Sequence, residues 1–351
     1  EEFYMIQVEV NVKAIEDRYK QLSKLTPSTK IIPVIKNNCN GLGIKTMAKV
    51  FDNLTDIVAT SYAEEILPLD IEARKLAWIW DVESYSKLYY NATEKQKAKV
   101  ELVCKELDQV QFCYDNNIPI HLAFNIGMNR GGFTLTDIKS LCDIIKDYNY
   151  PLYLTTHCPA EDRLYIEDYE ERFWKLFETI NEYSTLKISE FNTHYTNSAV
   201  FKTLSNDKPF LGGYARLGEH LLLPKTIEED GENYNPVTIS TKIAHIQKVA
   251  AGETVGYQHY KASRDMTVAV LPVGYYNFDN INTVYCPKTS TKFKVLAQMH
   301  DTTIIRIPDG FSLQRGDEIV LLNNKLMYDN WNKCIQRTFK FNPDLVQYKY
   351  K

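Results

Sequence analysis

The sequence predicts an α/β protein: a (β/α)8 TIM barrel followed by a mainly β C-terminal domain. Three observations carry this prediction. Between residues 30 and 220, short apolar runs alternate with segments whose apolar residues recur at helical spacing, which is typical of βα units. The apolar runs number eight, as a closed barrel of this kind requires. After residue 223 the sequence becomes strand-like and nearly free of helical patterns.

The eight predicted barrel strands are short apolar or β-branched runs bounded by polar segments: 31–35, 56–60, 76–80, 100–104, 118–124, 152–156, 190–194 and 213–216. Among the helices predicted between them, the clearest covers 166–183. Its apolar side chains line one face while Glu and Lys occupy the other: Ile166, Tyr169, Phe173, Phe177 and Ile180. The strict alternation of strand and helix predicts a parallel sheet.

A polar stretch at 224–233 predicts the domain boundary. We therefore expect the barrel over residues 8–223 and the β domain over 224–351, and we expect residues 1–7 to join the β domain as an edge strand. The strands of the β domain are predicted within five segments: 237–249, 266–273, 292–297, 302–307 and 318–322. With 351 residues, each domain can bury a core of its own.

Composition excludes several classes of protein. The 41 basic and 45 acidic residues give a net charge of −4, which offers no field for binding nucleic acid or anionic membranes. No apolar run approaches the ~18–20 residues of a membrane span, and the start lacks a signal-peptide pattern. The seven cysteines are scattered without C-x-x-C spacing, which indicates reduced thiols. We therefore predict a cytoplasmic protein.

Polar side chains follow the predicted strands, where the active sites of (β/α)8 barrels lie: Lys36, Ser61, Asn125 with Arg130, His157, Asn197 with Ser198, and Arg216. Lys36 is the most informative of them, because it ends a run of five mostly apolar residues. A lysine partly withdrawn from water can carry a neutral amine, which forms a Schiff base with an aldehyde. The alternative for Lys36 is an ordinary solvent-exposed lysine at a strand end.

Several segments together resemble the alanine racemase family. PVIKNNCNGLG at 33–43 is similar to the lysine motif by which this family binds pyridoxal 5'-phosphate. Further similar segments occur in the family's order: NIGMNRGGF at 125–133, TH at 156–157, HYTNSA at 194–199, ARLG at 215–218, AGETVGY at 251–257 and LPVGY at 271–275. The resemblance covers nearly the whole chain.

The resemblance implies a fold-type III pyridoxal-phosphate enzyme that works as a homodimer, each β domain completing the partner's site. Lys36 would hold the cofactor and act as the base on one face of the bound amino acid. Tyr257 of the partner subunit would act on the other face, and a phenol can do so where nearby positive charge stabilises its anion. The expected reaction interconverts L- and D-alanine, which would supply D-alanine for cell-wall precursors.

The resemblance also implies the remaining site residues. Arg216 would face the pyridine nitrogen, and a guanidinium leaves the ring a weaker electron sink than a carboxylate would; decarboxylases of this fold class carry an acidic residue there. The other cofactor-binding residues would be His157, Asn197, Ser198, Gly218 and Tyr348. The substrate-binding residues would be Arg130, Tyr275, Met299 and His300. No metal ligand is expected.

Four places in the sequence depart from the family pattern. Asn40 stands where the family has a phosphate-binding tyrosine, and Ala123 stands where it commonly has a lysine, often carbamylated. The family's Met-Asp pair is Met299-His300-Asp301 here, so either Met299 or His300 would meet the substrate carboxylate. The family's Gly-Tyr-Ala-Asp-Gly is Gly274-Tyr275-Tyr276-Asn277-Phe278 here, with Tyr275 retained. Because this wall surrounds the substrate side chain, serine or a broader range of amino acids is an alternative to alanine.

Two other readings compete with a racemase. One takes His121, His157 and His194 as metal ligands, because two of them lie near predicted strand ends, where barrel hydrolases bind zinc. The losses at Asn40 and Ala123 suggest instead a pyridoxal-phosphate carrier or an inactive paralogue. Carriers of this kind resemble the barrel alone, so the β domain with Tyr257 favours an enzyme.

Overall fold

The computed structural model describes residues 5–159, 162–223, 234–257, 260–277, 281–323, 326 and 346–351. The chain divides into two compact units. One unit comprises residues 16–39 and 44–221, and the other comprises the N-terminal residues to Ile15, residues 40–43 and the chain from Leu222 onward. The predicted connection at 224–233 lies outside the described residues.

The first unit is an eight-stranded parallel barrel, which confirms the predicted fold class. Strands β3 to β8 pair in sequence order, and β2 pairs with β9. Single parallel bridges, Val34 to Ala59 and Thr196 to Ala215, join these two sheets and close the ring. The strands are β2 (Lys30–Pro33), β3 (Ile57–Tyr62), β4 (Arg74–Ile79), β5 (Val100–Cys104), β6 (Ile120–Ala123), β7 (Leu152–Thr155), β8 (Thr193–His194) and β9 (Tyr214–Leu217).

One predicted strand is much shorter than expected. The segment 190–194 begins as a 3-10 turn, η2 (Glu190–Asn192), and only β8 (Thr193–His194) pairs in the barrel. The Ser189 hydroxyl accepts a hydrogen bond from the Phe191 amide at 3.3 Å. Such a local bond offers the backbone an alternative to strand pairing, so the turn replaces the first part of the predicted strand.

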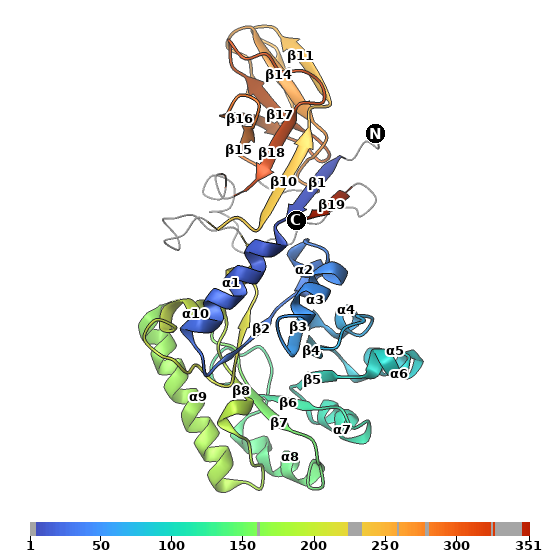
Figure 1. Ribbon diagram of the computed structural model, residues 1–351, viewed down its shortest axis with the longest axis vertical. Helices are drawn as coiled ribbons and strands as arrows, with labels where there is room; N and C mark the ends of the chain where they lie inside the picture. Colours follow the sequence, from blue (N-terminus) through green and yellow to red (C-terminus); the bar gives the residue numbers. More distant parts are fainter. Residues whose placement is uncertain are drawn as a thin grey trace. The chain divides into compact units, whose positions relative to one another are not determined.

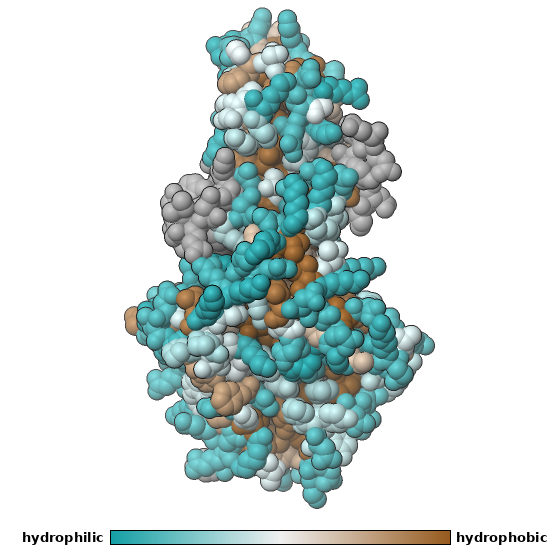
Figure 2. Space-filling model, in the orientation of Figure 1, coloured by the Kyte–Doolittle hydropathy of each residue, from teal (hydrophilic) through white to brown (hydrophobic). Residues whose placement is uncertain are grey.

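Helices lie around the outside of the barrel (Figure 1), and their outward side chains are largely hydrophilic on the face shown in Figure 2. The long α9 (Arg163–Tyr183) confirms the prediction for 166–183 and begins three residues earlier, where Asp162 accepts a bond from the Tyr165 amide. The others are α1 (Val12–Leu25), α3 (Ile44–Asp52), α4 (Ala63–Ile66), α5 (Val82–Asn91), α6 (Glu94–Lys97), α7 (Leu107–Asp115), η1 (Leu135–Asp137), α8 (Ile138–Ile144), α10 (Ser198–Leu204) and α11 (Glu219–Leu222).

The interior of the barrel is a packed core. Inward side chains of the barrel strands form one buried cluster: Ile32, Ile57, Ala59, Leu76, Val103, Ala123, Tyr153 and Tyr214. Its apolar members hold the strands together through burial of hydrophobic surface.

The second unit is built on a nine-stranded sheet in the order β11-β14-β17-β16-β15-β18-β10-β1-β19. Neighbours are antiparallel except for the parallel pair β1 and β19. The bounds are β1 (Ile6–Val10), β10 (Val237–Lys242), β11 (His245–Val249), β14 (Met266–Leu271), β15 (Thr283–Cys286), β16 (Thr291–Gln298), β17 (Thr303–Ile307), β18 (Glu318–Leu322) and β19 (Val346–Tyr350). Strands β12 (Thr254–Val255) and β13 (Tyr260–Lys261) form a separate hairpin.

The N-terminal strand differs from expectation in its place. We expected it at the edge of the sheet, but β1 lies between β10 and β19, so β19 is the terminal strand of the order. The parallel partner β19 covers the side of β1 that would otherwise be open. In the part of the chain that the structure describes, no helix is long and apolar enough to span a bilayer.

Candidate active site

Lys36 is followed by an unusual backbone segment. In α2 (Lys36–Asn40), the φ angles of Asn37, Asn38, Cys39 and Asn40 lie between +53° and +56°, so the chain makes a left-handed turn. Asparagine tolerates this region better than most residues, which explains why three of the four positions are Asn. The turn redirects the chain immediately after the barrel strand.

Two phenols of β19 hold the residues that follow this turn. Tyr348 donates to the Gly41 carbonyl at 3.1 Å, and Tyr350 donates to the Leu42 carbonyl at 2.9 Å. Gly43 has a φ of +93°, and a Cβ there would lie 2.2 Å from the Tyr350 hydroxyl. A glycine is therefore required where the segment leaves these phenols.

The Lys36 amine stands at the carboxyl end of β2. Its side chain is half-buried, and across the described ranges it makes no hydrogen bond or ion pair. Besides burial, four positive charges lower the pKa of the His157 ring: those of Arg216, Arg130, Lys36 and Lys105. The structure thus brings together Lys36, Arg130, His157 and Arg216, which the sequence analysis placed at the ends of four different strands.

Arg130 lies on the loop after β6. The Asn125 side chain accepts bonds from the Gly127 and Asn129 amides, at 3.2 and 3.0 Å, and so fixes the first part of this loop. A Cβ at Gly132 would lie 2.8 Å from the Ala123 carbonyl oxygen, so the loop returns close to the strand that it leaves. Both contacts hold the arginine above the barrel.

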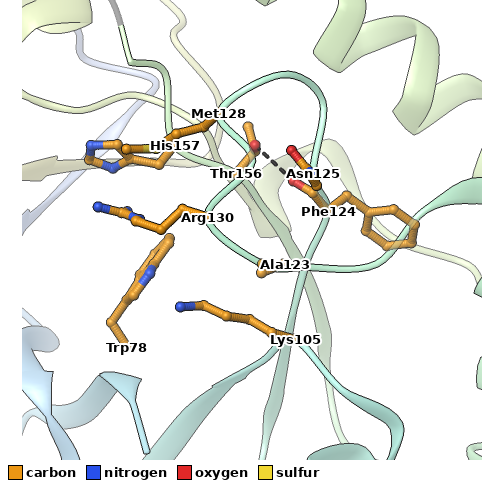
Figure 3. A pocket seen from close by; sticks show the side chains of 10 residues that line it. Trp78, Lys105, Ala123, Phe124, Asn125, Met128, Arg130, Thr156 and His157 are labelled. Carbon is orange, nitrogen blue, oxygen red and sulfur yellow. Dashed lines mark hydrogen bonds between the residues drawn. The ribbon is translucent and has the colours of Figure 1, made fainter.

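The loop and two neighbouring strands line a pocket. Figure 3 shows the side chains of Lys105, Arg130 and His157 extending toward the side where Trp78 lies. The Lys105 amine lies 5.8 Å from the Trp78 ring centroid, within the range of a cation–π contact. The pocket is lined by Trp78, Lys105, Ala123, Phe124, Asn125, Met128, Arg130, Gly131, Thr156 and His157, and none of these carries a carboxylate.

The positive charges in this pocket repel one another. Burial and then the charge of Arg130 lower the pKa of Lys105. Burial likewise lowers the pKa of Arg130. These shifts mark a site whose cations lack a neighbouring anion among the lining residues. An anionic ligand would relieve the repulsion.

His157 is held in its neutral form. Burial and then the charge of Arg216, followed by those of other cations, lower its pKa to about 3. The Tyr169 hydroxyl donates to the His157 carbonyl oxygen at 2.9 Å, and the Asn197 amide nitrogen lies 3.5 Å from the ring Nε2. The ring is therefore a neutral donor and acceptor near the Lys36 side of the pocket.

Arg216 is buried within the barrel, with 6% of its surface exposed. Its Nη1 donates to the Thr155 hydroxyl at 3.0 Å and to His194 Nδ1 at 2.7 Å, and also to the His194 carbonyl. Its Nη2 donates to the Thr156 carbonyl at 2.7 Å. Burial and the charge of Arg130 lower its pKa to about 9, so it keeps its charge at neutral pH.

The zinc alternative finds no support in the described ranges. His121 and His194 point at one another, with 2.7 Å between His121 Nδ1 and His194 Nε2. Nowhere in those ranges are three His, Cys, Asp or Glu side chains grouped as metal ligands would be. The two rings are used in hydrogen bonding.

The predicted phosphate-binding residues lie at the loops after β8 and β9. Asn197 caps α10, because its Oδ1 accepts from the Ala199 and Val200 amides at 3.0 and 3.1 Å. The Gly218 amide donates to the Ser198 hydroxyl at 3.4 Å, which joins the two loops. Tyr348, the remaining predicted member, contacts Gly41 as described above.

The predicted residues of the β unit lie near one another. The Tyr275 amide donates to the Met299 carbonyl at 2.9 Å, and the Tyr275 and His300 rings are 5.3 Å apart. A Cβ at Gly256 would lie 3.7 Å from the Met299 sulfur, so Met299 is beside the residue that precedes Tyr257. Tyr257 itself is 70% exposed.

Sequence reasoning missed two residues of the pocket. Lys105 directly follows β5, so the rule that found Lys36 at a strand end also applies to it. Trp78 lies within the apolar run of β4, where nothing in the sequence separates it from a core residue. Its ring faces the Arg216 guanidinium at 4.5 Å, a contact that depends on the closed barrel.

Comparisons with known proteins agree with this geometry. The family model "Alanine racemase, N-terminal domain" matches residues 10–221, and "Alanine racemase, C-terminal domain" matches residues 236–339. An alanine racemase of Fusobacterium nucleatum subsp. nucleatum is 27% identical over 345 residues, covering 93% of each chain. Another, of Clostridium acetobutylicum, is 25% identical and covers 90% of this chain and 86% of that protein.

Solved structures show the same fold. The alanine racemase of Streptomyces coelicolor A3(2) superposes with a TM-score of 0.82 at 16% identity, covering 99% of this chain and 98% of that one. The enzyme of Acinetobacter baumannii gives 0.79 at 19% identity, covering 99% and 100%. With both family models matched in order along most of its length, the chain belongs to the alanine racemase family.

Proposed function

We propose that this protein is a pyridoxal 5'-phosphate-dependent amino-acid racemase that interconverts L- and D-alanine by a two-base mechanism. One observation carries the proposal: the Lys36 amine stands at the carboxyl end of β2, pairs with no side chain among the described residues, and is one of the cations that lower the pKa of His157. The two relatives named above, both alanine racemases, support the choice of substrate.

The side chains present suit this cofactor. It carries an aldehyde, which an amine can bind covalently, and a phosphate, which cations and hydroxyl or amide donors can hold. The pocket offers Lys105 and Arg130 with no carboxylate in its lining, and Trp78 Nε1 is a buried donor without a partner. Lys36 would bind the aldehyde, while Ser198, Gly218 and the loop that Asn197 caps would face the phosphate.

The cofactor, when bound, withdraws electrons from the α-carbon of the amino acid and so makes its hydrogen acidic. Lys36 would take or return that proton at Nζ on one face. Tyr257 of the partner subunit would do the same at its phenolic oxygen on the other face. Two bases on opposite faces are what inversion of the α-carbon requires.

Arg216 would set the electronic character of the site. Its guanidinium retains its protons at neutral pH, because its pKa of about 9 lies above that range. It would therefore donate an N–H toward the ring nitrogen and deliver no proton to it. This arrangement favours rapid return of the α-proton and so supports racemisation over competing reactions.

In this proposal, a charged donor and three wall residues that the resemblance implies confine the substrate. Arg130 would meet the substrate carboxylate as a charged donor. Tyr275, Met299 and His300 would form the wall beside the substrate side chain. Alanine fits the names of the relatives, and serine or a broader range is the alternative, to be separated by comparing the rates for L-alanine and L-serine.

The test of the proposed function is replacement of Lys36. We expect Lys36→Ala to lose the absorption of the bound cofactor and to racemise L-alanine at least ~10³-fold more slowly, since the base and the covalent anchor are both removed. Borohydride reduction of the wild type should place the cofactor on Lys36, as read by mass spectrometry. The control is Lys87→Ala, whose exposed side chain pairs with Glu83 on the surface. A Lys36→Ala protein that racemises normally would refute the assignment.

A further inference from the structure

A chain of buried polar side chains crosses the barrel interior from Arg216. Arg216 Nη1 lies 2.7 Å from His194 Nδ1, His194 Nε2 lies 2.7 Å from His121 Nδ1, and His121 Nε2 lies 2.8 Å from Glu101 Oε2. The four residues come from β9, β8, β6 and β5. Each has no more than 6% of its surface exposed, so water does not compete for these bonds.

At the end of this hydrogen-bonded series opposite Arg216, Glu101 forms an ion pair with Arg74. Arg74 Nη1 lies 3.1 and 3.2 Å from the two oxygens of Glu101, and Arg74 also donates to the hydroxyls of Tyr153 and Tyr214 at 2.9 and 2.8 Å. Burial opposes ionisation of Glu101, but the His121 hydrogen bond and the charge of Arg74 outweigh it and lower its pKa. Glu101 is therefore a carboxylate, which can only accept.

The directions of the three bonds follow from the two ends. Arg216 can only donate, so His194 Nδ1 accepts and carries no proton. Burial and then the charge of Arg216 lower the pKa of His194, so the ring is neutral and its proton is on Nε2. That proton is donated to His121 Nδ1. Burial also lowers the pKa of His121, and its single proton, on Nε2, is donated to Glu101.

The rings have little freedom to turn. The His121 ring stacks on Tyr153, with centroids 4.1 Å apart and planes 6° apart. The Thr155 hydroxyl donates to the His194 carbonyl at 2.8 Å and accepts from Arg216. In the described part of the chain, Arg216 has no carboxylate within ion-pair distance. The anion connected to Arg216, through His194 and His121, is Glu101.

We propose that Glu101 is a positioning residue for Arg216: by accepting from His121, it fixes both imidazoles in the Nε2–H tautomer and so leaves His194 Nδ1 as the acceptor that holds the guanidinium. The catalytic consequence rests on the proposed function. The tautomers and the position of Arg216 do not, and they can be measured without turnover.

Loss of the carboxylate has a defined consequence. With Glu101→Gln, one of the two atoms facing Arg74 becomes an NH2 group, which cannot accept from that cation. If the amide oxygen turns toward Arg74, the NH2 group faces His121 Nε2 and favours the other tautomer. The change of tautomer at His121 then forces the same change at His194. His194 Nδ1 now carries a proton, and this N–H faces the N–H groups of Arg216. Arg216 Nη1 loses one of its acceptors and shifts away from His194 Nδ1.

The first experiment uses the wild-type holoenzyme labelled with 15N only in histidine imidazoles. We expect the 15N shifts of His121 and His194 to report two neutral rings protonated at Nε2 throughout pH 6–8. Signals that disappear in His121→Asn and His194→Asn identify the two rings. A proton on His194 Nδ1, or a doubly protonated ring, would overturn the proposal, and no variant has to retain activity for this result.

The second experiment compares three variants of the holoenzyme. In a crystal structure of Glu101→Gln we expect the Arg216 Nη1 to His194 Nδ1 separation to exceed ~3.5 Å, the limit of a hydrogen bond, with a shifted cofactor absorption band and ~10-fold slower racemisation. The matched control is Glu170→Gln. Glu170 is also a buried carboxylate, paired with Lys208 and Tyr195, but it lies on α9 outside this chain of bonds.

The third variant, His121→Asn, separates positioning from charge. Its amide oxygen can replace Nδ1 as the acceptor for His194, so Arg216 should keep its place, and adding Glu101→Gln to it should cause no further shift. Equal positions of Arg216 in Glu101→Gln and Glu170→Gln would overturn the proposal. A wild-type protein with the expected tautomers but without racemase activity would instead refute the proposed function alone.

Discussion

His157 shows how the environment of a single residue sets its chemistry. Its ring lies among four cations, and burial together with their charge holds its pKa at about 3, well below the usual ~6.5. A neutral imidazole adds no further charge to a site that is already positive. The neutral ring can still donate or accept a hydrogen bond with a neighbouring phenol. The resemblance implies that this phenol is that of Tyr257 of the partner subunit.

The same shift predicts how stability depends on pH. The unfolded chain binds a proton at this histidine below pH ~6.5, whereas the folded protein resists it until about pH 3. The contribution of the neutral His157 ring to the free energy of unfolding is therefore complete above pH ~6.5 and is lost as pH falls. Between pH 7 and pH 5, the apoprotein should lose ~2 kcal/mol of its free energy of unfolding through this residue.

Urea unfolding of wild type and His157→Gln at both pH values measures this loss. We expect the variant to lose ~2 kcal/mol less than the wild type on acidification. His245→Gln is the control, because His245 is exposed on β11 of the other unit. Identical pH dependence in wild type and His157→Gln would contradict the assigned environment.

At the scale of elements, the left-handed turn after β2 is the feature that places Lys36. Four consecutive residues with φ near +55° cannot form a right-handed helix, so the chain makes a left-handed turn directly after Lys36 at the strand end. Such residues are strained unless their surroundings hold them. The phenols of Tyr348 and Tyr350, which bind the next two carbonyls, supply part of that support.

Substitution of Asn37 tests the strain. Asn37→Val should lower the free energy of unfolding by ~1–2 kcal/mol, because a β-branched residue is disfavoured at φ of +54°. Asn37→Gly should stay within ~0.5 kcal/mol of the wild type, because glycine adopts this region freely. Chemical unfolding of the two variants measures the difference, and equal stabilities would mean that the turn rearranges.

At the scale of the whole molecule, the proposed site needs two chains. Tyr257 is 70% exposed, and Tyr275 and Tyr276 beside His300 are 45% and 60% exposed. Aromatic side chains exposed together are typical of surfaces that bind a partner. A second copy of this chain would use them to complete the proposed site around Lys36.

Mixing two inactive variants tests this sharing of the site. Lys36→Ala and Tyr257→Phe should each racemise alanine poorly as homodimers. After dissociation and reassembly at equal amounts, random pairing should restore about one quarter of wild-type activity, because half of the dimers then contain one intact site of two. No recovery despite mixed dimers, shown by mass spectrometry of the intact complex, would exclude a site completed by the partner.

The sequence by itself determined the eight barrel strands, the helix at 166–183 and most of the second sheet, because alternating burial leaves a clear pattern of apolar residues. It also placed Lys36, Arg130, His157 and Arg216 at strand ends. It overestimated the strand at 190–194, where the Ser189 hydroxyl competes for the backbone, and it put the N-terminal strand at an edge that β19 covers.

Only the tertiary structure decided which of these groups act together. Trp78, Lys105, His121, His194 and Glu101 are scattered over 117 positions of sequence, and no local pattern connects them. Closing the barrel brings the side chains of His121, His194 and Glu101 into one buried interior, where an unsatisfied polar group is costly. The charge of Arg216, the neutrality of His157 and the direction of the histidine hydrogen bonds follow from that closure.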